Sequence, residues 1–200
     1  MITVIDYGLG NLASVANALE KLEIPYLVSG DIEVLKTAKA LILPGVGAAG
    51  QGMENLKERG MDQVIIEQAR IGTPILGICL GMQLLFSSSE EGNVNCLGLI
   101  EGEVKKFDTS LKVPQIGWNQ IECKSDSVLL KGIKNNSYFY FVNSYYCDPR
   151  EENTIKGVTD YKVKFCSVVE KDNLYGVQFH PEKSGGVGLQ LLKNFWEAVC

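Results

Sequence analysis

A cysteine set between two glycines is the first place in this sequence where residue type and spacing could support catalysis. Cys79 lies in the pattern G-x-C-x-G, between an apolar run over Pro74 to Ile78 and an amphipathic helical pattern that begins at Leu80. We therefore predict a strand, a tight turn and a helix over Thr73 to Phe86. Small neighbours let the chain reverse sharply, so this turn would expose the thiol as a nucleophile elbow does.

The thiol at this turn could act as a nucleophile. The N-terminal amides of the following helix would favour the thiolate, which is the reactive form of cysteine, and the backbone N–H of Leu80 could donate to an oxyanion. The alternative is that Cys79 is a small buried hydrophobic residue, as most free cysteines are. The short pattern alone does not decide between these interpretations, because glycines also mark ordinary turns.

The single histidine of the chain stands at the end of another predicted strand. His180 lies in the segment YGVQFHPEKS, where the apolar run Leu174 to Phe179 stops at Pro181, and Glu182 follows two residues later. A cysteine, a histidine and a carboxylate at strand ends supply a nucleophile, a general base and a group that orients the base. We therefore predict that Cys79, His180 and Glu182 form a catalytic triad.

Composition indicates a soluble globular protein with one domain over residues 1–200. The chain is 46% hydrophobic and 22% charged, with a net charge of −5 and no basic run, so we expect no nucleic-acid partner. The apolar runs are too short to span a bilayer, and the N-terminal segment MITVIDYG has no basic region or cleavage site. We therefore expect neither membrane insertion nor secretion.

The six cysteines are scattered without C-x-x-C spacing, in a chain large enough to fold on its own core. We expect them to be reduced thiols in a cytoplasmic protein. With one histidine and no cysteine pair at ligand spacing, we expect no metal site. The six positions are Cys79, Cys96, Cys123, Cys147, Cys166 and Cys200.

The first part of the chain alternates predicted strands and helices joined by short connections. Such units form a parallel sheet that is covered by helices on both faces. The expected strands are Ile2 to Ile5, Tyr26 to Val28 and Ala40 to Leu43, and the expected helices are Leu12 to Glu23, Asp31 to Lys39 and Gln51 to Arg70, the last interrupted near Gly60.

Two glycine-containing loops follow strands in this part. The loop over Asp6 to Asn11 does not meet the G-x-G-x-x-G pattern, because Ala13 replaces a glycine, so we expect no nucleotide cofactor. We expect this loop to face the carboxyl edge of the sheet. In the loop Pro44 to Gly47, glycines on both sides of Val46 could expose consecutive amides, as an oxyanion hole requires. The alternative there is a simple connection from strand to helix.

After Phe86 the residues become alternating, aromatic and β-branched, which is typical of antiparallel strands. We therefore expect an antiparallel extension of the same domain. The expected strands are Leu99 to Phe107, Ile116 to Cys123, Tyr138 to Tyr145, Ile155 to Tyr161 and Lys162 to Val169, and Gly185 to Gly188 leads into a final helix over Leu189 to Val199.

Six segments of the chain resemble the class I (triad) glutamine amidotransferases, and more narrowly the glutaminase subunits of imidazole glycerol phosphate synthases of histidine biosynthesis. The segments are DYGLGNLASV, PGVGA, GICLGMQLLF, IGWN, YFVNSYY and GVQFHPEKS. The resemblance covers nearly the whole chain. It implies an α/β, flavodoxin-like fold of three layers, α/β/α, with a mostly parallel central sheet plus an antiparallel extension.

The resemblance implies that the chain hydrolyses L-glutamine through a glutamyl thioester on Cys79, with His180 protonating the ammonia and Glu182 fixing the imidazole tautomer. No cofactor or metal is implied. The residues implied for the oxyanion are Val46, Gly47 and Leu80, and those implied for the amino-acid end of the substrate are Gly47, Gln83, Ser144 and Tyr145.

The resemblance also implies a partner. Ammonia would pass to a separate (β/α)8-barrel synthase subunit in a heterodimer, and Asn11, Trp118 and Lys183 match positions that face this partner. Three alternatives remain: a glutaminase subunit that serves a related amidotransferase of surface-sugar biosynthesis, a non-catalytic scaffold of the same fold, and a triad used for other chemistry, as in the cysteine peptidase-like members of this fold. Gln83 and the segments IGWN and YFVNSYY favour glutamine over the last of these.

Three positions depart from the residues that the resemblance leads us to expect. Gln115 and Asn143 each replace a histidine, and Ala49 replaces an aromatic residue. None of them belongs to the predicted triad, so the departures concern the identity of the partner rather than the hydrolysis of glutamine.

Overall fold

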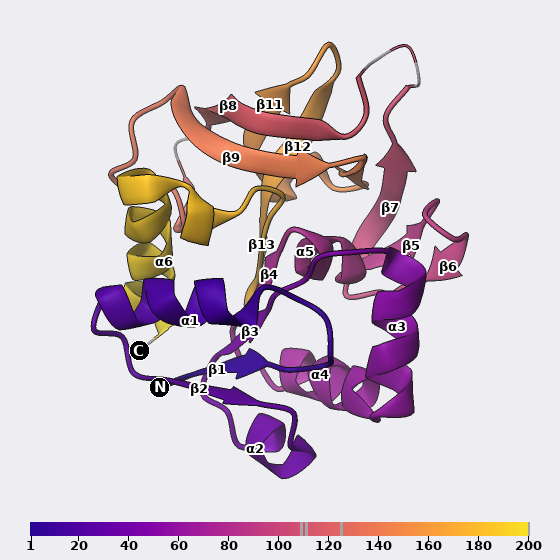
Figure 1. The fold of residues 1–200 in the computed structure, drawn as a ribbon, viewed down its shortest axis with the longest axis vertical. Coiled ribbons are helices and arrows are strands. Elements are labelled where there is room, and N and C mark those ends of the chain that lie inside the picture. The colour runs from indigo at the N-terminus through magenta and orange to yellow at the C-terminus, as the bar shows by residue number, and fades with distance from the viewer. Residues whose placement is uncertain (109, 111, 125, 200) are drawn as a thin grey trace.

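Five parallel strands form the centre of the fold in a computed structural model that describes residues 1–108, 110, 112–124 and 126–199. Each strand is paired in parallel with its neighbours, and the C-terminal strand of the set lies beside the elbow strand (Figure 1). Their order is β2 (Tyr26–Ser29), β1 (Ile2–Ile5), β3 (Leu41–Leu43), β4 (Ile75–Ile78) and β13 (Leu174–Val177).

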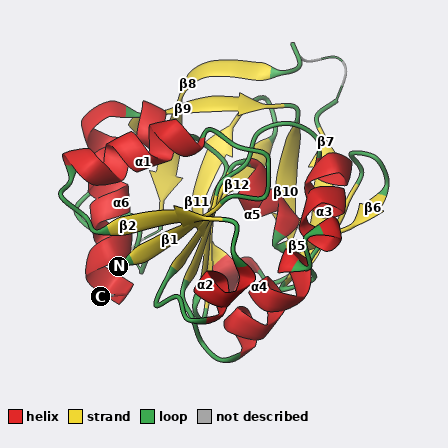
Figure 2. Cartoon of the chain, turned by 60° about the horizontal axis from the view of Figure 1, so that its bottom comes forward, coloured by secondary structure: helices red, strands yellow, loops and turns green. Residues whose placement is uncertain are grey.

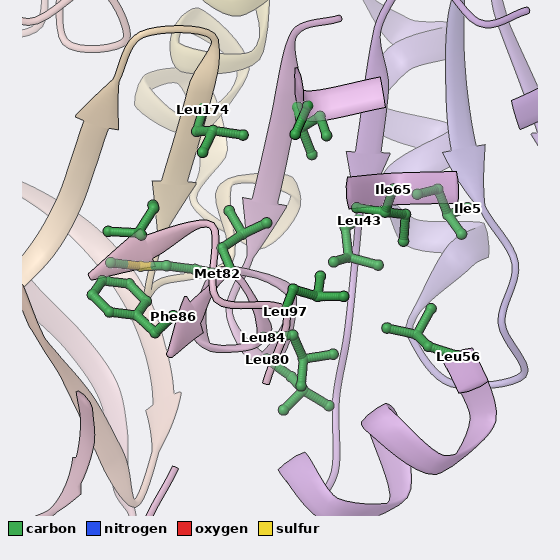
Figure 3. Close-up of a cluster of buried hydrophobic side chains, with 14 of the residues drawn as sticks. Ile5, Leu43, Leu56, Ile65, Leu80, Met82, Leu84, Phe86, Leu97 and Leu174 are labelled. Carbon is green, nitrogen blue, oxygen red and sulfur yellow. The ribbon is translucent and has the colours of Figure 1, made fainter. Parts of the chain in front are cut away.

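Helices cover both faces of this sheet, which gives the three layers predicted from the sequence (Figures 1 and 2). Successive strand residues point to opposite faces, so Val4 belongs to one buried cluster and Ile5 to the other. Figure 3 shows the cluster that contains Ile5, in which Leu43 and Ile65 lie near Ile5 and Met82 lies near Phe86. The helices are α1 (Leu12–Lys21) and α6 (Gly185–Val199) on one face, and α2 (Ile32–Lys36), α3 (Ala49–Glu58), α4 (Met61–Arg70) and α5 (Leu80–Leu84) on the other.

The sheet continues beyond β13 as the predicted extension, which is mostly antiparallel. Strand β12 pairs with β13, and a branch through β11 carries the hairpin β8–β9 (Figure 1). The extension contains β12 (Lys164–Lys171), β10 (Tyr145–Pro149), β7 (Ile100–Lys106), β5 (Phe86–Ser89), β6 (Val94–Asn95), β11 (Ile155–Asp160), β8 (Gln115–Cys123) and β9 (Ser137–Asn143), with 3₁₀ turns η1 (Glu152–Thr154) and η2 (Pro181–Lys183).

The helix after the elbow is shorter than predicted. Helix α5 ends at Leu84, all five of its residues are buried, and Phe86 already begins β5. The expected amphipathic pattern was wrong, because this helix lies inside the fold with no face to solvent. The predicted interruption near Gly60 is confirmed, since Gly60 takes a left-handed conformation (φ 65°) between α3 and α4.

Two other boundaries differ from the prediction. The expected strand Tyr138 to Tyr145 is two strands, because the chain changes pairing partners at Ser144, from β8 to β7 and β12. The final helix begins at Gly185 rather than at Leu189. Gly188 lies against the turn before it, where a Cβ atom would stand 1.9 Å from the carbonyl oxygen of Pro181, so only glycine lets the helix start this close.

In the part of the chain that the structure describes, no helix is both long and apolar enough to cross a membrane. The five described cysteines are free, and Cys200 lies outside the described residues. Cys147 and Cys166 stand directly opposite each other on β10 and β12, and burial raises the pKa of both thiols.

Candidate active site

The turn at Cys79 has the conformation expected of a nucleophile elbow. Its φ of 54° and ψ of −108° lie outside the regions that L-residues normally occupy, which typically costs about 1–3 kcal/mol. A Cβ atom on Gly81 would stand 1.7 Å from the carbonyl oxygen of Leu43, and one on Gly77 would stand 2.6 Å from the backbone nitrogen of Met82. Only glycine therefore fits on either side of the thiol.

Strand β13 brings the single histidine to this turn. Val177 pairs with Ile78 on the elbow strand, and the backbone N–H of Cys79 donates to the carbonyl of Val177 over 2.7 Å. His180 follows three residues later and is 2% exposed. Because the two strands are parallel neighbours, their carboxyl ends deliver the thiol and the imidazole to one edge of the sheet.

Both the backbone and the side chain of His180 are held in place. Its N–H donates to the carbonyl of Tyr140 over 2.9 Å, and its carbonyl accepts from Ser184 Oγ over 2.6 Å. The imidazole Nδ1 lies 2.8 Å from Glu182 Oε1, and the carboxylate is buried. Nδ1 therefore carries the proton that faces Glu182, which leaves Nε2 for the thiol.

The surroundings favour the charged form of the imidazole. Burial lowers the pKa of His180, but hydrogen bonds and charge interactions with Cys79 and Glu182 together outweigh it and raise the pKa from 6.5 to about 10. At neutral pH the group is thus an imidazolium between a sulfur and a carboxylate. An imidazolium can protonate a leaving amine, and the neutral imidazole left afterwards can activate water.

A cavity of about 250 Å³ opens at this edge of the sheet. Every residue predicted for the nucleophile, base, oxyanion and substrate roles lines this cavity. Glu182 does not line it but contacts His180. The roles themselves stay predictions. The cavity is lined by Val46, Gly47, Cys79, Leu80, Gln83, Glu91, Pro114, Val142, Asn143, Ser144, Tyr145 and His180.

The glycine loop Pro44 to Gly47, which follows β3, is held by a hydrogen bond from the buried Tyr7. The hydroxyl of Tyr7 donates to the carbonyl of Pro44 over 2.9 Å, and a Cβ atom on Gly45 would stand 2.6 Å from that hydroxyl. Burial and the neighbouring Cys79 raise the pKa of Tyr7, so its hydroxyl keeps the proton that it donates. Farther along, Gly47 has a φ of 104°, and the position where a Cβ atom would stand is open, so glycine is required here by the backbone conformation and not by lack of space.

A model of the family described as "Glutamine amidotransferase class-I" matches residues 3–199. The chain belongs to this family. A subunit named imidazole glycerol phosphate synthase subunit HisH from Moorella thermoacetica is 50% identical over 199 residues, which cover 99% of this chain and 95% of that protein. The subunit of the same name from Chlorobium luteolum is 50% identical over 98% of this chain and 100% of its own length.

Solved structures agree with the fold of this amidotransferase. A crystal structure of a glutamine amidotransferase superposes with a TM-score of 0.80 at 19% identity, covering 100% of this chain and 99% of the other. A structure of PurLQS from Thermotoga maritima superposes with a TM-score of 0.77 at 20% identity, covering 100% and 98%. At these identities the likeness concerns the three-layer architecture.

A buried glutamine that we did not predict touches the thiol. Gln178 Nε2 lies 3.7 Å from Cys79 Sγ, and its Oε1 accepts from Gln83 Nε2 over 3.0 Å. Gln83 Nε2 also donates to the carbonyl of Tyr145, so both of its hydrogens are used within the protein and only Oε1 remains for a substrate. Gln178 stands two residues before His180, and strand alternation could have placed it on the same side.

Glu91 is a second residue that we did not predict. Of the described residues lining the cavity, it alone carries a carboxylate, and its Oε2 accepts from the backbone N–H of Ala49 over 2.8 Å. The bond fixes one oxygen and leaves the other for a cation. Glu91 follows β5 in a loop with no recognisable pattern, so no signal in the sequence pointed to it.

The residues predicted to face a partner lie outside the cavity. Trp118 is 56% exposed on β8, and Lys183 is exposed on η2. The side chain of Asn11 instead turns inward, and its Nδ2 donates to Glu182 Oε1. Among the described residues, no three His, Cys, Asp or Glu side chains are grouped so as to hold a metal ion.

Proposed function

We propose that this chain is the glutaminase subunit of an imidazole glycerol phosphate synthase, located in the cytoplasm. It would hydrolyse L-glutamine and deliver the ammonia to a (β/α)8-barrel subunit. The observation that carries the proposal is the Cys79 thiol in a strained turn, beside the imidazole of His180 that Glu182 holds, in a cavity of amino-acid size. The two relatives named as HisH subunits support the choice of synthase.

The first half of the reaction forms a thioester. The sulfur of Cys79 attacks the carboxamide carbon of glutamine, and the carbonyl oxygen becomes an oxyanion. The C–N bond then breaks as His180 Nε2 gives its proton to the nitrogen, so ammonia leaves and the imidazole becomes neutral. Glu182 keeps Nδ1 protonated and stabilises the positive charge that the imidazole carries before this transfer.

The second half regenerates the thiolate. A water molecule gives a proton to His180 Nε2 as its oxygen attacks the thioester carbon, and the C–S bond breaks to release glutamate. Thiolate and imidazolium are then restored. The proton given to the ammonia and the proton taken from water both pass through Nε2 of the same imidazole, which is the single histidine of this sequence.

The walls of the cavity fit the rest of the substrate. The carboxylate of Glu91 would pair with the α-ammonium group of glutamine, which is the only cationic group of that substrate. Backbone amides near Val46 or Gly47, and that of Leu80, would hold the oxyanion. Leu80 is the first residue of α5, so its N–H has no acceptor within the helix and is free for this role.

The hairpin β8–β9 offers a face for the barrel subunit. Ile116, Trp118 and Tyr138 point to its outer side and are 64%, 56% and 54% exposed. Exposed apolar side chains gathered on one face mark sites where another protein binds. The inner side of the same hairpin carries Asn143 into the cavity, so a partner on the outer face would contact the strands that form the cavity wall.

The test measures glutamate release from glutamine by the chain alone and with a histidine-pathway barrel subunit bound to its sugar-phosphate ligand. We expect a slow reaction alone and a large increase with the ligand-bound partner. Cys79→Ala should abolish the reaction in both conditions, whereas Cys123→Ala, the same change at a thiol outside the cavity, should keep it. Activity in Cys79→Ala would refute the triad, and no increase with the barrel would refute the choice of synthase.

A further inference from the structure

We infer that Asn11 is a positioning residue of the triad, which holds the carboxylate of Glu182 against His180 from a loop at the other end of the sequence. The inference rests on the proposed function and goes beyond it. Asn11 touches neither the thiol nor the cavity in which glutamine would bind, so it acts through Glu182.

The first observation is a shared acceptor. Oε1 of Glu182 lies 2.8 Å from His180 Nδ1 and also accepts from Asn11 Nδ2. With donors from both Asn11 and His180, the orientation of the Glu182 carboxylate is better defined than it would be with His180 alone. The side chain of Glu182 has no exposed surface, so water does not compete for this oxygen.

The second observation is a helix cap that is not used. Asn11 occupies the N-cap position of α1, where asparagine normally accepts from a backbone N–H of the first turn. Within the described residues, its side chain makes no such bond, and its buried Oδ1 has no partner. The residue therefore gives up a stabilising local contact, while its amide N–H₂ reaches a carboxylate 171 positions away.

The third observation concerns the other oxygen of Glu182. A second cavity of about 300 Å³ lies between α1 and the start of α6, with Glu182 and Lys21 in its lining. The buried Oε2 of Glu182 has no partner among the described residues. Without the bond from Asn11, the contact with His180 Nδ1 would be the one hydrogen bond left on this carboxylate among the described residues, so its orientation against the imidazole would be less well defined.

The single histidine gives a direct readout of this support. We would follow the imidazole of His180 by NMR titration of the isolated chain in a Cys79→Ser background, which removes the sulfur that also raises its pKa. Glu182→Gln should lower the titration midpoint of His180, because the carboxylate raises the pKa of the imidazole. The shift in this variant gives the largest change that loss of the carboxylate can produce. Asn11→Ala should shift the midpoint in the same direction by about one pH unit, a tenfold loss of proton affinity.

Asn17 provides the matched control, since it lies on the same helix, is exposed and lines the second cavity. Asn17→Ala should leave the midpoint at the value of the background. A midpoint in Asn11→Ala that stays there or rises would overturn the inference. So would an equal shift in Asn17→Ala, because the cause would then be a general change in α1.

The activity of the complex gives the second readout. With saturating barrel subunit, Asn11→Ala should lower kcat about tenfold and leave KM within about twofold, because the substrate contacts are kept. Asn11→Asp, which keeps the shape but replaces the donor by an acceptor, should lose more. Wild-type activity in Asn11→Asp would overturn the inference, whereas activity in Cys79→Ala would defeat the proposed function instead.

Discussion

Two pairs of buried amide side chains lie at the candidate site, with one member of each pair lining the cavity, and they differ in how their polar atoms are used. Gln83 and Gln178 bond to each other and onward to the carbonyl of Tyr145 and the sulfur of Cys79. Gln115 and Asn143 stand opposite each other on β8 and β9, yet three of their four polar atoms have no partner among the described residues. The first pair has no buried polar atom without a partner among the described residues, whereas the second pair has three.

The difference separates what is fixed in this site from what can change. A buried polar atom without a partner costs about 1–3 kcal/mol, so the β8–β9 wall would gain from any polar guest or rearrangement that satisfies it. The Gln83–Gln178 pair has no such buried atom among the described residues, and its Gln83 Oε1 is left for a substrate. The outer face of the same hairpin carries the exposed Trp118, so the incomplete wall is also the wall that a partner would touch.

The largest loss of stability and activity is expected at Gln178, in the pair whose buried polar atoms are all bonded. Gln178→Met keeps the length of the side chain but removes the acceptor for Gln83 and the donor to the sulfur of Cys79. Chemical denaturation should show a loss of about 1–3 kcal/mol in the free energy of unfolding. The glutaminase rate of the complex should fall about tenfold or more, since hydrogen bonds to charged groups contribute about 1.5–3 kcal/mol. Wild-type stability and rate would mean that the hydrogen bonds from Gln83 to Gln178 and from Gln178 to Cys79 do not form in solution.

An intermediate effect is expected at Asn143. Its Nδ2 donates to the carbonyl of Tyr145 over 2.9 Å, while its Oδ1 has no partner among the described residues. Asn143→Leu therefore loses one bond and also removes one unsatisfied atom, so the free energy of unfolding should change by less than about 1 kcal/mol. A loss as large as that of Gln178→Met would show that Oδ1 is bonded in solution, and the contrast between the walls would fail.

The smallest or an opposite effect is expected at Gln115. Gln115→Met is the same chemical change as Gln178→Met, but neither atom of this amide has a partner in the described part of the chain. The free energy of unfolding should stay the same or rise, by up to about 2 kcal/mol, when the variant is unfolded in denaturant. If basal hydrolysis persists while stimulation by the barrel subunit weakens, Gln115 has its partner only in the complex, which would sharpen the comparison.

The triad could be predicted from the sequence because its signals are local. A G-x-C-x-G turn, a single histidine at a strand end and a carboxylate two residues later each stand in one short segment. The α/β layers were equally predictable from alternating apolar runs and helical patterns. Parallel pairing of β4 and β13 then places Cys79 and His180 together, as the rule for sheet edges requires.

The remaining features depend on partners that are distant in the sequence. The bond between Asn11 and Glu182 joins residues 171 positions apart, and the loop of Glu91 meets the cavity only because β5 pairs with β7. The break at Ser144 follows from a change of strand partners, which a continuous aromatic run does not reveal. The length of α5 is set by burial on all sides, and amphipathic periodicity carries no information about such a helix.

The pairing of β4 with β13 also sets when the chemistry can begin during synthesis. The elbow strand leaves the ribosome early, while its parallel neighbour is made only after the whole antiparallel region, since Cys79 and Gln178 are 99 positions apart. Domains generally fold as units. A growing chain that ends before His180 therefore carries a thiol without a base, and it cannot release ammonia into the cell before the strand of His180 has joined the sheet.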